Sequence, residues 1–146
     1  MKSSDIILHK DFECFDGFHK GKFLIVLNNP KPEENFLVLL TTSKGFYKTF
    51  NGELRERPTV KGCHPPEGCF FIPQGSEWFP EPTWACFDFK EFDQQVTLKN
   101  EAKGTFKKKS SLTLLTFQLL INCIKNSQDL SPIQRKLISA PAKILC

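Results

Sequence analysis

The chain has 146 residues, of which 40% are hydrophobic and 25% are charged, and its formal net charge is +4. This length predicts a single domain that is large enough to bury a hydrophobic core. No apolar run approaches the ~18 residues of a transmembrane helix, and the N-terminal apolar run is too short for a signal peptide, so we expect a cytoplasmic protein without a membrane span.

Two apolar runs near the N-terminus, residues 22–28 and 36–44, predict neighbouring β-strands. A turn with two prolines separates them. Both runs are continuously apolar, which favours strands covered on both faces, as in a small closed barrel. Residues 1–10 fit a short helix or an edge strand, and the alternating residues 11–17 could begin the sheet.

The middle of the chain is expected to alternate loops with short strands. Residues 44–66 are rich in polar residues, glycine and proline, so we expect loops there. Residues 69–72 form a short apolar run, and residues 83–89 alternate between apolar and polar, so both predict strands. Residues 91–97 should continue the sheet or turn its corner.

The pattern changes at residue 99. Residues 99–109 are basic and predict a loop, whereas leucines at helical spacing predict a helix over about 111–126 that is buried on more than one side. Ser131 as N-cap and Pro132 as first helical residue predict another helix. The predicted fold is therefore mainly β (α+β): one domain over 1–146, with a small barrel over 12–98 and a C-terminal helical hairpin over 110–140.

The six cysteines do not require a disulfide framework, because a chain of this size can build a core without one. Cys86 and Cys123 lie within apolar elements and are interpreted as small core residues. Cys63 and His64, with Cys69, lack the paired spacing of a zinc site. We therefore expect no metal and no cofactor.

Hydroxyl and ammonium groups collect where the second apolar run ends, at residues 41–44. They can hold an anionic oxygen, although such residues also simply terminate strands. Lysines gather around residues 20–22 and again at 99–109. These lysines would suit a polyanionic partner, or they are ordinary solvated surface.

The order of these features resembles the MazF/PemK-like toxin family. A basic residue enters the run over 22–28, a proline-containing turn follows, and the next strand ends in Thr-Thr-Ser-Lys; residues 69–75 and 83–89 resemble the later strands of that family. The resemblance covers about 12–98. It implies an SH3-like β-barrel and an endoribonuclease that cuts single-stranded RNA without a metal, forms a homodimer and is neutralised by an antitoxin protein.

The resemblance also implies site residues. Thr41 or Thr42 takes the position of a hydroxyl residue in the family, and Lys22, or Lys20 in a shifted alignment, takes that of an arginine. Lysine keeps the charge but lacks the planar fork that grips two phosphate oxygens. Histidine suits the proton transfers because it titrates near neutral pH. The expected catalytic residues are Lys22, Thr41, Thr42 and His19. The expected RNA-binding residues are Lys20, Ser43, Lys44, Arg55, Arg57 and His64.

Two other functions stay open. The lysine at position 22 favours a degenerate barrel that binds nucleic acid or a protein partner without cleaving RNA. Alternatively, the chain is a structural barrel whose apolar helix over 111–126 docks on another protein.

Overall fold

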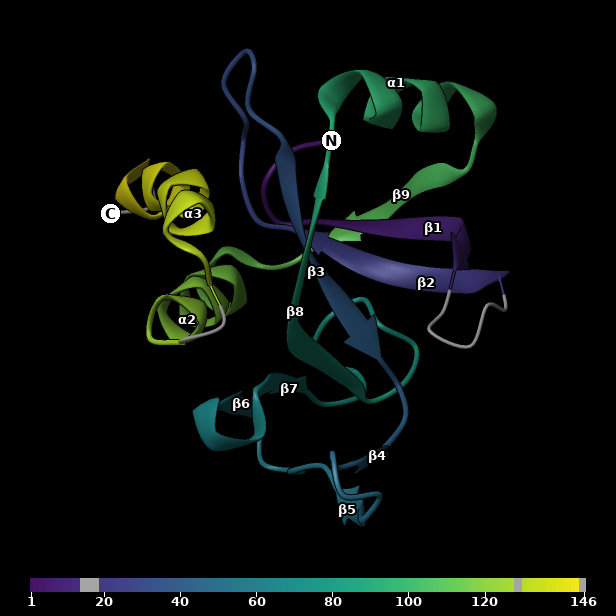
Figure 1. The fold of residues 1–146 in the computed structure, drawn as a ribbon, viewed down its shortest axis with the longest axis vertical. Helices are drawn as coiled ribbons and strands as arrows, with labels where there is room; N and C mark the ends of the chain where they lie inside the picture. The colour runs from purple at the N-terminus through teal and green to yellow at the C-terminus, as the bar shows by residue number, and fades with distance from the viewer. Residues whose placement is uncertain (14–18, 128–129, 145–146) are drawn as a thin grey trace.

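A seven-stranded antiparallel sheet forms the centre of the molecule (Figure 1). The computed structural model describes the backbone of residues 1–13, 19–127 and 130–144, and the side chains of the same residues except 19 and 139–144. The strands are β1 (Asp5–Glu13), β2 (His19–Val26), β3 (Phe36–Thr42), β6 (Gly62–His64), β7 (Cys69–Ile72), β8 (Thr83–Phe92) and β9 (Phe106–Ser111). Their order across the sheet is β6-β7-β8-β3-β2-β1-β9.

The mainly β, α+β class is confirmed, and the two apolar runs form β2 and β3 at the middle of the sheet. Strands β6 and β9 are the two edge strands of this sheet, and no pairing within the described residues joins them into a closed barrel. Residues 5–13 form one long strand between β2 and β9, so over residues 5–10 the strand alternative holds and the helix does not, but the strand is not at the edge of the sheet. Residues 11–13 belong to the sheet as expected, and residues 14–17 lie outside the described residues.

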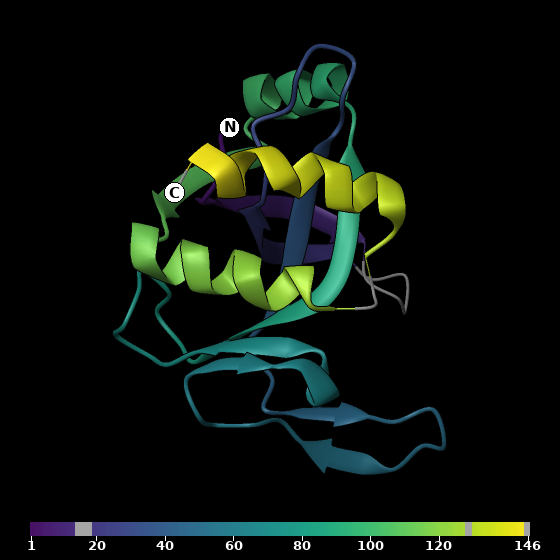
Figure 2. The ribbon, with the colours of Figure 1, turned by 90° about the vertical axis from the view of Figure 1, so that its left-hand side faces the viewer.

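Two helices, α2 (Leu114–Lys125) and α3 (Pro132–Ile144), lie side by side over one face of the sheet (Figure 2). They bury the side chains of that face, such as Leu39 and Phe70, against Phe117 and Leu120 of α2. Burial of this apolar surface is the main force that holds helices and sheet together. The predicted pair of C-terminal helices is confirmed. Among the described residues, none of the helices has the length and apolar character of a membrane span.

The start of α3 was also predicted correctly. Ser131 Oγ accepts a hydrogen bond from the Gln134 N–H at 3.1 Å, and Gln134 Oε1 accepts one from the Ser131 N–H at 3.1 Å. This reciprocal pair is a capping box, which satisfies backbone donors that a helix N-terminus leaves free.

The segment after β8 differs from the prediction. Helix α1 (Gln94–Lys103) stands where a continued sheet was expected, and β9 stands where a loop was expected. Asp93 begins α1, because its carboxylate accepts hydrogen bonds from the N–H groups of Gln95 and Val96. The expected loop lysines 107–109 are exposed on the edge strand β9, where charge discourages pairing with another chain.

Helix α2 is buried on one side only. Leu114, Leu115 and Leu119 are 58%, 68% and 48% exposed, so the expectation of burial on more than one side was wrong for these residues. The helix packs on the sheet and on α3, and nothing within the described residues covers these leucines.

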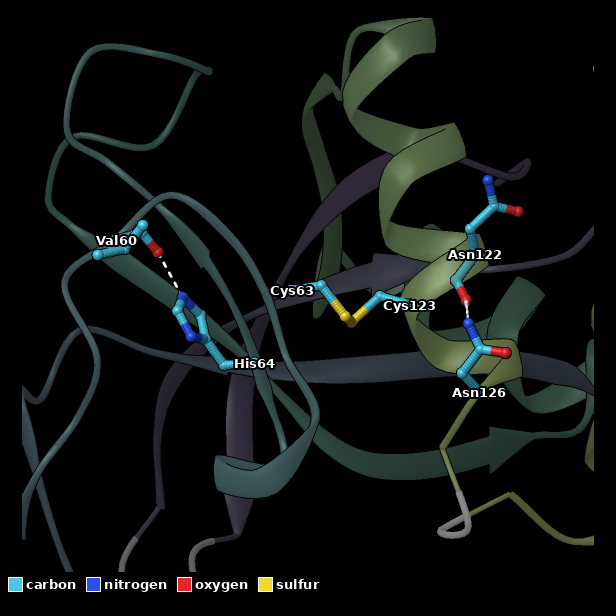
Figure 3. The surroundings of a disulfide bond; sticks show 6 residues. All are labelled: Val60, Cys63, His64, Asn122, Cys123 and Asn126. Atoms are coloured by element: carbon cyan, nitrogen blue, oxygen red, sulfur yellow. Dashed lines mark hydrogen bonds between the residues drawn. A yellow bond between two sulfur atoms is a disulfide. The ribbon is translucent and has the colours of Figure 1, made fainter.

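A disulfide joins Cys63 of β6 to Cys123 of α2 (Figure 3). The interpretation of Cys123 as a simple core cysteine was therefore wrong. The bond fastens the helical layer to β6, the short strand at one edge of the sheet, which otherwise pairs only with β7 within the described part of the sheet. Strands β4 (Phe46–Lys48) and β5 (Leu54–Glu56) form a separate two-stranded hairpin within the region where only loops were expected. This hairpin lies at the bottom of Figure 2.

The N-terminus of α2 is capped by a side chain from a distant part of the chain. Thr113 precedes the helix and its own side chain makes no capping bond. Instead, the Glu77 carboxylate accepts hydrogen bonds from the Thr113 N–H at 2.8 Å, the Thr113 hydroxyl at 3.0 Å and the Thr116 hydroxyl at 3.1 Å. A carboxylate at this end also complements the helix dipole.

We expect Glu77→Gln to lower the free energy of unfolding by about 1–2 kcal/mol, because the substitution removes a charged acceptor at the helix end. Urea unfolding measures this difference. The matched control is Glu56→Gln, which changes an exposed carboxylate on β5 and should alter stability by less than about 0.5 kcal/mol. Equal stability of the two variants would contradict the capping role.

Candidate functional site

Strands β2 and β3 separate near one end and form a fork. They pair from Val26↔Val38 to Leu24↔Leu40. Beyond that point β2 continues along β1, while β3 continues along β8. At the point of separation the Thr41 hydroxyl donates a hydrogen bond to the Phe23 carbonyl at 2.8 Å, so it holds the base of this strand fork.

A pocket of about 330 Å³ opens in the strand fork. Three lysines and one glutamate line it, so its formal charge is positive. The segment between β7 and β8 supplies the opposite wall. The lining residues are Lys20, Gly21, Lys22, Phe23, Thr41, Thr42, Ser43, Lys44, Phe79, Pro80, Glu81 and Thr83.

Six of the predicted site residues meet at this pocket, from the adjoining ends of β2 and β3. Because side chains alternate along a strand, Lys22 and Phe23 project to opposite faces of β2. Lys22 is half-buried, with its Nζ atom 5.9 Å from the centre of the Phe12 ring. At this distance the ring attracts the ammonium group and helps to orient it.

The hydroxyl groups at the end of β3 have different capacities. Thr41 is buried and its proton is committed to the Phe23 carbonyl, so its role is structural. Thr42 Oγ1 accepts a hydrogen bond from the Lys44 N–H at 3.2 Å, and a hydroxyl that accepts can still donate its own proton. Ser43 is exposed. Thr42 and Ser43 are therefore the hydroxyl donors available to an anion in the pocket.

Three predicted residues do not line the pocket. Arg55 lies on the exposed hairpin and pairs with Glu53 at 3.1 Å. Arg57 lies over the Tyr47 ring, 5.0 Å from its centre. His64 lies on β6, where its ring is hydrogen-bonded to a backbone carbonyl (Figure 3). The backbone of residue 19 begins β2, but its side chain lies outside the described residues.

The wall between β7 and β8 contains residues that the sequence reasoning missed. Glu81 is a lining residue of the pocket, as the three lysines are. Its backbone carbonyl accepts a hydrogen bond from the Thr83 hydroxyl at 2.9 Å, which orders this wall. Trp78 packs edge-on against Phe23, with ring centres 5.1 Å apart, and is 38% exposed. The turn-rich composition of this stretch carried no sign of which strands it would face.

Within the described residues no three His, Cys, Asp or Glu side chains gather in a way that could hold a metal ion. The pocket offers one carboxylate and three ammonium groups, a donor set that suits anions rather than cations.

Comparison of the chain with protein-family models, curated proteins and solved structures finds no match. The fold and the pocket define a mainly β, α+β protein with a basic, hydroxyl-lined pocket. The resemblance to MazF/PemK-like toxins stays a prediction.

Proposed function

We propose that the chain is a toxin-type endoribonuclease that binds and cleaves single-stranded RNA at the strand-fork pocket. The observation that carries this proposal is the meeting of three lysines with the hydroxyls of Thr42 and Ser43 in one concave site. Ammonium and hydroxyl groups are the side chains that hold RNA phosphates in place.

The pocket residues suit the chemistry of RNA cleavage. The 2′-oxygen attacks the neighbouring phosphorus, the bond to the 5′-oxygen breaks, and a cyclic phosphate and a 5′-hydroxyl result. Glu81 takes the proton of the 2′-hydroxyl, and the Lys44 ammonium returns a proton to the leaving oxygen. Lys22 and Thr42 stabilise the charge on the other phosphate oxygens.

Trp78 supports a single-stranded substrate. Its ring is partly exposed and packs on Phe23, which lines the pocket. An exposed aromatic ring beside a phosphate site provides a platform on which an unpaired base can stack.

The proposal includes the SH3-like barrel relationship, a cytoplasmic site of action, a homodimer and a neutralising antitoxin. The exposed leucines of α2 support a protein partner, because their burial would remove apolar surface from water. The leucines concerned are Leu114, Leu115 and Leu119.

Binding of nucleic acid without cleavage is the second candidate function. Three observations favour it. The Thr41 proton is committed to a backbone carbonyl, and none of the described histidine side chains lines the pocket. The arginine that the family would place at position 22 is also replaced by lysine.

Incubation of the purified protein with mixed single-stranded RNA in the presence of a chelator separates these functions. Fragments that end in a cyclic phosphate, and that are lost with Thr42→Val and Glu81→Gln, are the result expected of the endoribonuclease. RNA that is retarded on a gel but stays intact selects binding without cleavage. RNA that is neither bound nor cleaved overturns both.

A further inference from the structure

Two cysteines that do not line the strand-fork pocket face each other across the neighbouring strands β7 and β8. Cys69 of β7 and Cys86 of β8 are register partners, and both are free thiols. Side chains of directly opposed residues project to the same face of a sheet. The two sulfur atoms therefore belong to one site, on the face that carries Phe71 and Trp84.

The hydrogen bonding of the two strands shows which kind of pair this is. The Phe87 N–H donates to the Gly68 carbonyl at 2.9 Å, so Gly68 and Phe87 form a hydrogen-bonded pair. Pairs alternate along an antiparallel ladder, so Cys69 and Cys86 form a non-hydrogen-bonded pair, whose Cα atoms typically lie about 4.5 Å apart. Disulfides span Cα distances of roughly 4.4–6.8 Å, so the backbone can accept a bond here.

The surroundings give the two thiols different roles. Cys69 is fully buried, and burial raises the pKa of its thiol to about 11. Cys86 is half-buried. Burial raises the pKa of the Cys86 thiol too, but the charges of Arg57 and Lys22 oppose this shift. Arg57 Nη1 donates to Cys86 Sγ at 3.5 Å, so a cation adjoins the sulfur that solvent reaches first.

We propose that Cys69 and Cys86 are a reversible modification site that reacts with low-molecular-weight disulfides and closes into an intramolecular disulfide. The Cys86 thiolate attacks one sulfur of the small disulfide, a mixed disulfide forms and one small thiolate leaves. The Cys69 thiolate then attacks Cys86 Sγ and expels the second small thiolate. Two protein thiols are oxidised, one small disulfide is reduced to two thiols, and the two cysteine protons pass to the leaving thiolates.

Arg57 connects this site to the β4–β5 hairpin. Its guanidinium contacts both the Cys86 sulfur and the Tyr47 ring, and its backbone N–H donates to the Gly45 carbonyl at 2.7 Å. Oxidation converts the sulfur next to Arg57 from a thiol that can ionise into a neutral disulfide. The charge of Arg57 then has no thiolate to stabilise at this position.

The test uses the unmodified chain, incubated with oxidised glutathione at mildly alkaline pH, alkylated and digested at glutamates without reduction. Cleavage after glutamates places Cys69 in a fragment over 68–77 and Cys86 in one over 78–91, because the bond between Glu81 and Pro82 resists cleavage, and both are apart from Cys63. We expect these two fragments to be joined and the number of alkylated thiols to fall by two.

Two variants sharpen the result. Cys69→Ser should trap glutathione on Cys86, and Cys86→Ser should leave the buried Cys69 unmodified. The unmodified chain decides the matter even if a variant fails to fold. Glutathione that stays attached to Cys86 in that chain, or a thiol count that does not change, overturns the proposal.

Discussion

Replacing Lys22 by alanine is expected to lower the rate of RNA cleavage by about 10²–10³-fold, the scale of losing one group that stabilises transition-state charge. Lys22 is half-buried in the strand fork and lines the pocket together with two more lysines, and its ammonium group lies near the Phe12 ring. Lys20 and Lys44 cannot replace it, because both are exposed and the surrounding water and salt screen their charges. Cleavage of a labelled single-stranded RNA measures the loss.

Lys22→Arg is the informative partner of this variant. A guanidinium keeps the charge and adds two parallel donors for phosphate oxygens, so cleavage should equal or exceed that of the unmodified chain. Lys99→Ala, on the exposed side of α1, is the matched control and should leave the rate unchanged. A Lys22→Ala variant as active as this control would exclude Lys22 from the site. Thermal unfolding of all three confirms that they are folded.

The elements that were predicted correctly are those whose sequence pattern lies within a few neighbouring residues. Continuous apolar runs with polar ends predicted β2 and β3, and Ser131 with Pro132 predicted the start of α3. Helix α1 was missed because it has no apolar stripe; Thr97 is its one buried residue among those described. Strand β9 was missed because it exposes lysines and is held by pairing with β1, a partner far away in the sequence.

The two walls of the pocket also differ in whether a local sequence pattern predicts them or a contact between distant segments forms them. The ends of β2 and β3 are close in sequence, so the meeting of Lys22 with Thr42 follows from an antiparallel pair of strands. The wall with Phe79 and Glu81 reaches the fork only because β8 pairs with β3, a long-range contact that turn-rich composition does not reveal. Arg55 and Arg57 were predicted as RNA-binding residues from their charge. Arg55 lies on β5 and is hydrogen-bonded to Glu53, whereas Arg57 follows β5 and is hydrogen-bonded to Cys86.

Removing the Cys63–Cys123 disulfide is expected to lower the free energy of unfolding by about 3–4 kcal/mol in the double variant Cys63→Ala, Cys123→Ala. The bond closes a loop of 60 residues, and a cross-link over such a loop restricts the unfolded chain strongly. The corresponding fall in melting temperature is about 10 °C for a chain of this size. Calorimetry of the two proteins measures it.

Reduction provides the control for this prediction. A reductant should destabilise the unmodified chain by a similar amount and leave the double variant unchanged, because the variant has no Cys63–Cys123 bond to lose. A double variant as stable as the unmodified chain would contradict the prediction. The result also bears on the proposed cytoplasmic site of action, because thiols stay reduced there. If the proposed ribonuclease acts in the cytoplasm, its strand fork must stay intact without this disulfide. RNA cleavage by the double variant therefore tests the proposed activity together with the proposed cytoplasmic site of action.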